Sequence, residues 1–146
     1  MKHIKQLNNL KQLSGAKANF SEADFTEKPT LFLFYNNQCL GCTGRAIPFA
    51  YKLQNEFACR LILIHSDFGR VSTEEEIKSI FTMTEIPFEI YRDENHQLYN
   101  HFNCEGTPHW VLFNQQAEVI QSIFGSQANA QNRLFYSLYQ IFYEMR

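Results

Sequence analysis

The six residues Thr30-Leu31-Phe32-Leu33-Phe34-Tyr35 form an unbroken apolar and aromatic run, and this run constrains the fold more than any other segment. It shows no alternation of polar and apolar side chains, which is typical of a strand buried on both faces of a sheet. A helical pattern follows from about residue 42 to residue 57, and a second buried strand is expected over 60–65. Two such strands joined by a helix make a βαβ unit, with a right-handed crossover as the default.

Further elements are expected on both sides of this unit. A short amphipathic segment over 4–10 and a single helical turn around Phe25 precede it. After it, the patterns predict helices over 72–83, 95–102 and 128–145, a brief strand over 88–91, and strands over 109–114 and 119–124 joined by a hairpin turn. The order of elements therefore predicts an α/β sandwich.

Length and composition exclude several classes of protein. The 146 residues contain no repeat and no Gly/Ser/Pro-rich linker, so a single domain over 1–146 is expected. A net charge of -2 gives no basic field, and nucleic acid is not an expected partner. No apolar run approaches the roughly 20 residues of a membrane span, and polar residues interrupt the stretch where a signal peptide would need its apolar core. A cytoplasmic location is therefore expected, where paired cysteines are more often catalytic or metal-binding than structural.

Two of the four cysteines, Cys39 and Cys42, lie directly after the first buried strand and at the start of the predicted helix. The free N–H groups and the positive dipole end of a helix stabilise a thiolate, and thiols in this position have pKa values of about 3.5–7.5. Two intervening residues let the sulfurs meet across one helical turn. Cys39, at the mouth of the turn, is the predicted nucleophile, and Cys42 is the predicted resolving thiol.

Two other interpretations of this pair stay open. A zinc ion could use both cysteines together with Cys104 and His109, although structural zinc sites usually carry two such pairs. Alternatively, the cysteines could be inert core residues. Cys104 is expected as a small buried hydrophobe or a third redox thiol, and Cys59 as a core or incidental surface thiol.

Four segments resemble the thioredoxin superfamily, in particular its TlpA/ResA-type thiol-disulfide oxidoreductases, over roughly residues 14–145. They are the strand block 28–35, the redox pair at 39–42, the helix-bending proline at Pro48, and Gly106-Thr107-Pro108 with the strand that follows it. The resemblance implies a thioredoxin-like three-layer sandwich, with a central mixed β-sheet flanked by helices and residues 1–14 as an N-terminal extension. It also implies that Pro108 is a cis-proline, the alternative being a trans-proline that merely begins a strand.

The function implied by the resemblance is disulfide exchange with protein substrates. Cys39 and Cys42 would be the catalytic residues, with no bound cofactor or metal, and a reductase would supply electrons. The loop at Pro108 would lie opposite Cys39. The substrate groove would consist of this loop and the neighbours of the cysteines, namely Thr107, Pro108, Gln38, Leu40 and Gly41. Independently of the resemblance, the many aromatic residues are expected mostly to fill the core, the alternative for Tyr35 and Trp110 being an apolar rim around Cys39.

The chain departs from the family pattern at three positions. Gln38 stands where thioredoxins carry a tryptophan, and Leu33 stands where they commonly carry a buried aspartate that relays protons. Pro48 lies one residue further from Cys39 than usual. An irregular turn is therefore expected over 43–45, and the proton of Cys42 is expected to leave by another route.

Two rival functions remain. A peroxide-reducing redoxin typically carries a proline seven residues and a hydroxyl residue three residues before its cysteine, where this chain has Phe32 and Asn36. A non-enzymatic thioredoxin-fold protein that binds metal or a partner is the other. The sequence leaves the oligomeric state open.

Overall fold

A mixed six-stranded sheet lies at the centre of the computed structural model, which describes residues 3–81 and 86–144. The strand order is β1-β4-β3-β2-β5-β6. Strands β2, β3 and β4 run parallel, whereas β1, β5 and β6 are antiparallel to their neighbours. The strands are β1 (Lys11–Gln12), β2 (Thr30–Tyr35), β3 (Arg60–Ser66), β4 (Glu89–Asp93), β5 (His109–Phe113) and β6 (Val119–Phe124).

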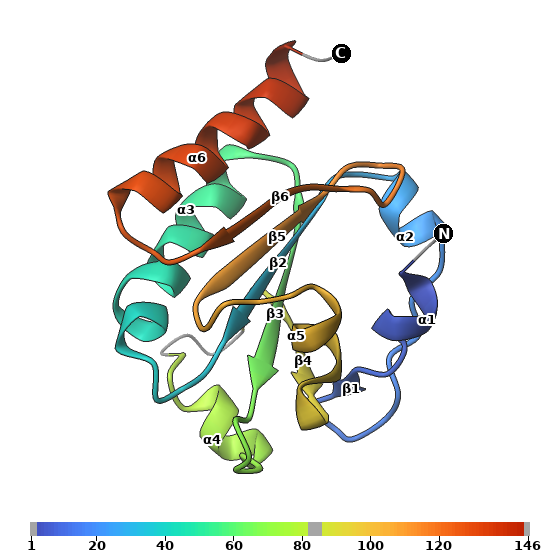
Figure 1. The fold of residues 1–146 in the computed structure, drawn as a ribbon, viewed down its shortest axis with the longest axis vertical. Coiled ribbons are helices and arrows are strands. Elements are labelled where there is room, and N and C mark those ends of the chain that lie inside the picture. The colour runs from blue at the N-terminus through green and yellow to red at the C-terminus, as the bar shows by residue number, and fades with distance from the viewer. Residues whose placement is uncertain (1–2, 82–85, 145–146) are drawn as a thin grey trace.

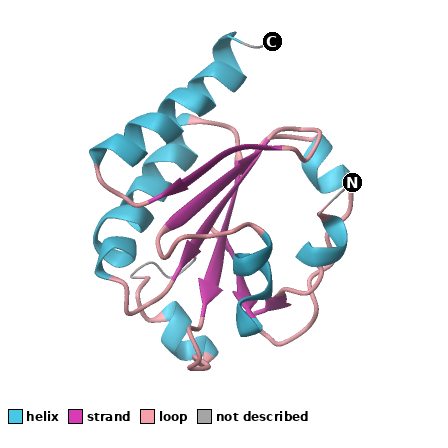
Figure 2. Cartoon of the chain, in the orientation of Figure 1, coloured by secondary structure: helices cyan, strands magenta, loops and turns pink. Residues whose placement is uncertain are grey.

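Helices cover both faces of the sheet (Figures 1 and 2). Helices α3 and α6 pack on one face, and α1, α2 and α5 lie on the other. Within the described residues, no helix is both long and apolar enough to span a membrane. The helices are α1 (Ile4–Leu7), α2 (Ala23–Thr26), α3 (Ile47–Glu56), α4 (Glu74–Lys78), α5 (Gln97–His101) and α6 (Ala128–Tyr139), with π-helical turns at Cys42–Ala46 and Gln140–Glu144 and a 3₁₀ turn at Glu94–His96.

Strand β2 divides the interior into two apolar cores, and all six of its residues are buried. Leu33 and Tyr35 belong to the core beneath α3 and α6, whereas Phe32 and Phe34 belong to the core beneath α1 and α5. The lack of alternation in this strand therefore has the predicted cause, burial on both faces, and the three-layer α/β sandwich with a mixed sheet is confirmed.

Several predicted elements are shorter in the structure than the patterns indicated. The helix expected over 72–83 is limited to α4, and residues 82–83 lie outside the described part of the chain, as does residue 145 of the closing helix. Of the expected N-terminal extension, residues 3–14 pack against the sheet, where Leu7 and Leu10 are buried and β1 pairs with β4.

Candidate active site

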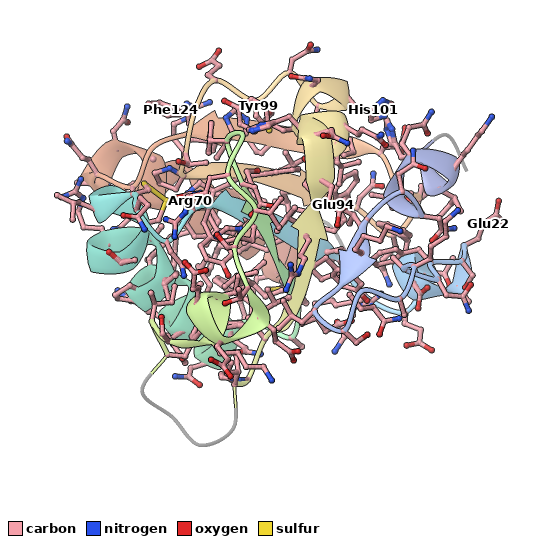
Figure 3. The ribbon with its side chains drawn as sticks, turned by 90° about the horizontal axis from the view of Figure 1, so that it is seen from below. Glu22, Arg70, Glu94, Tyr99, His101 and Phe124 are labelled. Carbon is pink, nitrogen blue, oxygen red and sulfur yellow. A yellow bond between two sulfur atoms is a disulfide. The ribbon has the colours of Figure 1, made fainter. Side chains whose placement is uncertain are left out.

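Cys39 and Cys42 lie just beyond the carboxyl end of the central strand β2, and a disulfide joins them across a Cα–Cα distance of 5.2 Å. Figure 3 shows this disulfide in yellow at the end of the helical segment that leads into α3. The predicted position, after a buried strand and at the start of a helix, is therefore the observed one.

The two cysteines differ in exposure. Cys39 is half-buried, whereas Cys42 has no exposed surface. The backbone N–H of Cys42 points at Cys39 Sγ, with the nitrogen 3.2 Å from the sulfur. In the reduced protein this N–H is placed to donate to a thiolate on Cys39, which stabilises the charged form.

The loop between β2 and Cys39 is fixed by side-chain hydrogen bonds. Asn36 Nδ2 donates to the carbonyl of Ser66 at the end of β3, and Asn36 Oδ1 accepts from the backbone N–H of Gln38. Asn37 Nδ2 donates to the carbonyl of Glu76 in α4. The loop that carries Cys39 is therefore anchored to the end of β3 and to α4 in the absence of substrate.

A π-helical turn follows the pair at Cys42–Ala46 and runs into α3, whose second residue is Pro48. A π turn accommodates one residue more than an α-helical turn and is frequent at functional sites. The irregular turn that the displaced Pro48 predicted over 43–45 is thus confirmed.

The loop at Pro108 lies against Cys39. The Thr107–Pro108 peptide bond is cis, as predicted, and the Thr107 carbonyl oxygen is 3.4 Å from Cys39 Sγ. The Pro108 carbonyl accepts from the backbone N–H of Gly125 at 2.8 Å, and the Gly125 carbonyl accepts from Trp110 Nε1. These bonds bring the end of β6 beside the cysteines.

Two hollows border the disulfide, and Cys39 and Thr107 line both of them. The first hollow, about 470 Å³, extends past Gly41 and Pro108 to the start of α6. The second, about 370 Å³, extends past Gln38 towards Asp67 and the labelled Arg70 in Figure 3. Gln38, Gly41, Thr107 and Pro108 thus line the two hollows as groove residues would, whereas the 85 % exposed Leu40 lines neither.

The prediction that Tyr35 and Trp110 form an apolar rim around Cys39 is wrong. Tyr35 and Trp110 have no exposed surface and belong to the core beneath α3 and α6, because their strand positions point into that face. The exposed aromatic side chains beside Cys39 are Phe124, at the end of β6, and Phe68, after β3.

A buried polar group lies beside the carboxyl end of β2. His65, at the end of β3, pairs with Tyr35 in the sheet, and its Nδ1 is 2.9 Å from an Asp67 carboxylate oxygen. Burial lowers the pKa of His65, and the negative charge of Asp67 opposes that change. Asp67 also lines the second hollow together with Cys39, so this hollow has a carboxylate on its wall.

The remaining cysteines lie apart from the pair. Burial raises the pKa of Cys59 to about 11 and that of Cys104 to about 12. Cys104 packs against the core on the face opposite Cys42. Over residues 3–81 and 86–144, the structure assembles no group of three or more His, Cys, Asp or Glu side chains suited to a metal ion, so it does not bring together the zinc ligands considered above.

The residues that the sequence did not predict at the site include Asp67 and Arg45, Ser126 from the loop between β6 and α6, and Arg133 from α6. The sequence predicts Arg45 only as part of the irregular turn over 43–45. The others carry no motif and reach the cysteines only through the order of strands in the sheet.

Comparison with solved structures places this architecture among known proteins. A thiol-disulfide isomerase from Corynebacterium glutamicum is 24 % identical, with a TM-score of 0.69 over 83 % of this chain and 86 % of that chain. A secreted Mycobacterium tuberculosis disulfide oxidoreductase, homologous to E. coli DsbE, is 17 % identical, with a TM-score of 0.65 over 92 % and 96 %. A putative thiol:disulfide interchange protein DsbE from Chlorobium tepidum is 15 % identical, with a TM-score of 0.69 over 87 % and 86 %.

These similarities and the sheet order define the class: the chain has the thioredoxin-like fold that the resemblance implied. Within that class, the solved structures named here are described as thiol-disulfide isomerases, oxidoreductases or interchange proteins. No protein-family model matches the chain, and no curated protein matches it by sequence.

Proposed function

We propose that this protein is a thiol-disulfide oxidoreductase that exchanges disulfides with protein substrates through Cys39 and Cys42. The observation that carries the proposal is the arrangement of a half-buried Cys39 against the cis Thr107–Pro108 loop, with the fully buried Cys42 directly behind it. Similarity to structures described as disulfide isomerases and oxidoreductases supports the same activity.

The exchange proceeds in two displacements. The Cys39 thiolate attacks one sulfur of a substrate disulfide, forms a mixed disulfide and releases the other substrate sulfur as a thiolate, which takes up a proton. Cys42, after losing its proton, attacks Cys39 Sγ and releases the second substrate sulfur. The substrate has gained two electrons, and the protein now carries the Cys39–Cys42 disulfide. A reductase of the dithiol class would return those electrons, and the reverse sequence would oxidise a dithiol substrate.

The rival functions have less support. Peroxide reduction lacks the proline and hydroxyl residue that would organise the peroxide, since Phe32 and Asn36 occupy those positions.

A cytoplasmic location remains a sequence-based proposal. It is tested by trapping the thiols in intact cells, because a cytoplasmic reductant would hold Cys39 and Cys42 mainly in the dithiol form.

The test uses the reduced protein and a disulfide-containing model peptide. Wild-type protein is expected to release the peptide thiols and end with the Cys39–Cys42 disulfide. Cys42→Ser is expected to accumulate a 1:1 mixed disulfide with the peptide, and Cys39→Ser is expected to form none. Cys104→Ser serves as the control and should react like the wild type. If Cys39→Ser reduces the peptide at the wild-type rate, the proposed function is wrong.

A further inference from the structure

The first hollow beside Cys39 has an unequal distribution of charge. It is bounded by Cys39, Gly41, Pro108, Phe124, Ser126 and the start of α6, and we call it the β6–α6 groove. Two arginines, Arg45 from the π turn and Arg133 from α6, line it, and within the described part of the chain none of its lining residues is Asp or Glu. The groove is therefore cationic in a protein whose net charge is -2.

Both guanidinium groups are available to a ligand. Arg45 Nε donates to Ser126 Oγ at 3.2 Å, which orients the group and leaves its terminal nitrogens unused by that bond. Among the described residues, neither Arg45 nor Arg133 forms an ion pair, although Arg60 and Arg70 each pair with a glutamate. A planar guanidinium without a carboxylate partner is suited to bind one in a bidentate manner.

The start of α6 adds to the same field. Gln127, the N-cap residue, makes no side-chain capping hydrogen bond, and the first turn of this 12-residue helix contains no acidic residue. Asn129 and Ala130 of that turn line the groove. Its backbone N–H groups and the positive end of the helix dipole therefore add to the two arginines.

Gly41 keeps the passage between Cys39 and the arginines open. A Cβ atom at this position would lie 3.3 Å from Ser126 Oγ and 3.4 Å from Arg45 Nη2. A substrate bound to Cys39 can thus extend along the groove. The second hollow differs, because it contains Asp67 as well as Arg70 and the half-exposed Phe68. The two sides of Cys39 consequently differ in charge.

We propose that the β6–α6 groove selects disulfides with a carboxylate close to the reacting cysteine and holds that carboxylate between Arg45 and Arg133. The proposal rests on the disulfide exchange proposed above and names its substrate class. The carboxylate can belong to an Asp or Glu side chain of a substrate protein or to a chain terminus that follows its cysteine.

The experiment compares short peptides with a single cysteine, whose sulfur is joined to a thiopyridine leaving group by a disulfide bond. The termini of the peptides are blocked unless stated otherwise. One peptide has Asp beside the cysteine, a second has Asn there, and a third has Asn and a free carboxyl terminus directly after the cysteine. Release of pyridinethione by the reduced protein gives the rate of attack by Cys39. The Asp peptide is expected to react about 3- to 10-fold faster than the Asn peptide at low salt, and about 0.5 M salt should reduce that ratio towards 1.

The matched variants isolate the two arginines. In Arg45→Gln/Arg133→Gln the Asp-to-Asn rate ratio is expected to fall to about 1. Lys28→Gln/Lys52→Gln, which removes the same charge from exposed positions outside the groove, should keep the wild-type ratio. The third peptide distinguishes the two sources of the carboxylate. If it reacts faster than the blocked Asn peptide, a terminal carboxylate is an acceptable ligand.

Equal rates for the Asp and Asn peptides in the wild type, or a ratio that survives in the double arginine variant, would overturn the inference. The Asn peptide keeps this outcome distinct from failure of the proposed function. If the Asn peptide reacts through Cys39 without any preference for Asp, only the groove inference fails. If no peptide reacts through Cys39, the oxidoreductase proposal fails.

Discussion

The backbone N–H of Cys42 lies 3.2 Å from the sulfur of Cys39, so the buried member of the pair supplies a hydrogen-bond donor to the accessible one. The same residue thus has two parts in the site. In the proposed disulfide exchange, its amide would stabilise negative charge on Cys39 before attack, and its thiol would resolve the mixed disulfide.

This arrangement predicts selective alkylation. When the reduced native protein is treated with iodoacetamide at pH 7, Cys39 should react at least about tenfold faster than any other cysteine. Cys42 is buried, and burial holds the pKa values of Cys59 and Cys104 near 11 and 12. Peptide mapping by mass spectrometry measures the four rates, and unfolded protein is the control in which all four should react. Early modification of Cys104 in the native state would contradict the prediction.

The burial of His109, directly after the cis-proline, predicts that the free energy of unfolding depends on pH. His109 is 2 % exposed, its Nδ1 accepts from the backbone N–H of Glu105, and its Nε2 lies 2.8 Å from Ser122 Oγ. Burial lowers the pKa of His109, with the charge of Glu105 opposing. Below the unfolded pKa of about 6.5, the unfolded chain takes up a proton that the folded chain resists. The free energy of unfolding therefore falls as the pH falls, by at most about 1.4 kcal/mol per pH unit for this group.

Urea unfolding at pH 7.5 and pH 5.5 measures this effect. His109→Gln should show a smaller loss of stability between the two values than the wild type, and His96→Gln, at a partly exposed position, is the control. His65, whose pKa burial also lowers, leaves part of the dependence in place. An unchanged pH dependence in His109→Gln would refute the assignment.

Sequence patterns captured the strands best, because an apolar run such as 30–35 has one stable location, the centre of a covered sheet. The spacing between Cys39 and Pro48 correctly predicted an irregular turn, because a helix can accommodate one extra residue as a π turn. By contrast, Tyr35 was expected at the rim because it is near Cys39 in sequence. The pleat of β2 turns it into the core beneath α3.

The position of Arg133 beside Cys39 could not be predicted from local sequence patterns, because it depends on the pairing of distant strands. Arg133 is 94 residues from Cys39, and only the pairing of β5 with both β2 and β6 brings the start of α6 to the cysteines. No local pattern marks such a residue. The same holds for Asp67, which the parallel pairing of β2 and β3 places beside Cys39.

Gly106 links the cis-proline loop to Phe124. Its φ is +138°, and a Cβ atom there would lie 2.8 Å from Phe124 Cε1. Gly106→Ala is expected to lower the free energy of unfolding by about 1–3 kcal/mol through backbone strain and displacement of the ring. Gly125→Ala, which has a φ of +107° and no atom within 4 Å of its Cβ, is the control for strain alone and should cost less. Chemical denaturation measures both variants.

A double-mutant cycle separates the two contributions. Because Phe124 is 49 % exposed, Phe124→Ala removes the ring without opening a core cavity. If the clash contributes, Gly106→Ala should cost less in the Phe124→Ala background than in the wild type. Equal costs in the two backgrounds would mean that only the backbone conformation is affected.

The π turn predicts the outcome of a one-residue deletion. Gly44 is exposed and a Cβ there would meet nothing within 4 Å, so its removal should let Cys42–Ala46 adopt an ordinary α-helical turn. Stability should stay unchanged or rise by up to about 1 kcal/mol, because a glycine has left the helix. Arg45 would then follow Cys42 by two residues instead of three. It would be rotated by about 100° around the helix axis and lose its bond to Ser126.

The deletion variant should therefore keep disulfide exchange with the Asn peptide while its Asp-to-Asn rate ratio falls. Gly44→Ala, which keeps the chain length, is the matched control and should retain the wild-type ratio. The two variants together distinguish the length of the turn from the flexibility of its glycine. A deletion variant with the full Asp preference would mean that the π turn does not position Arg45 for substrate.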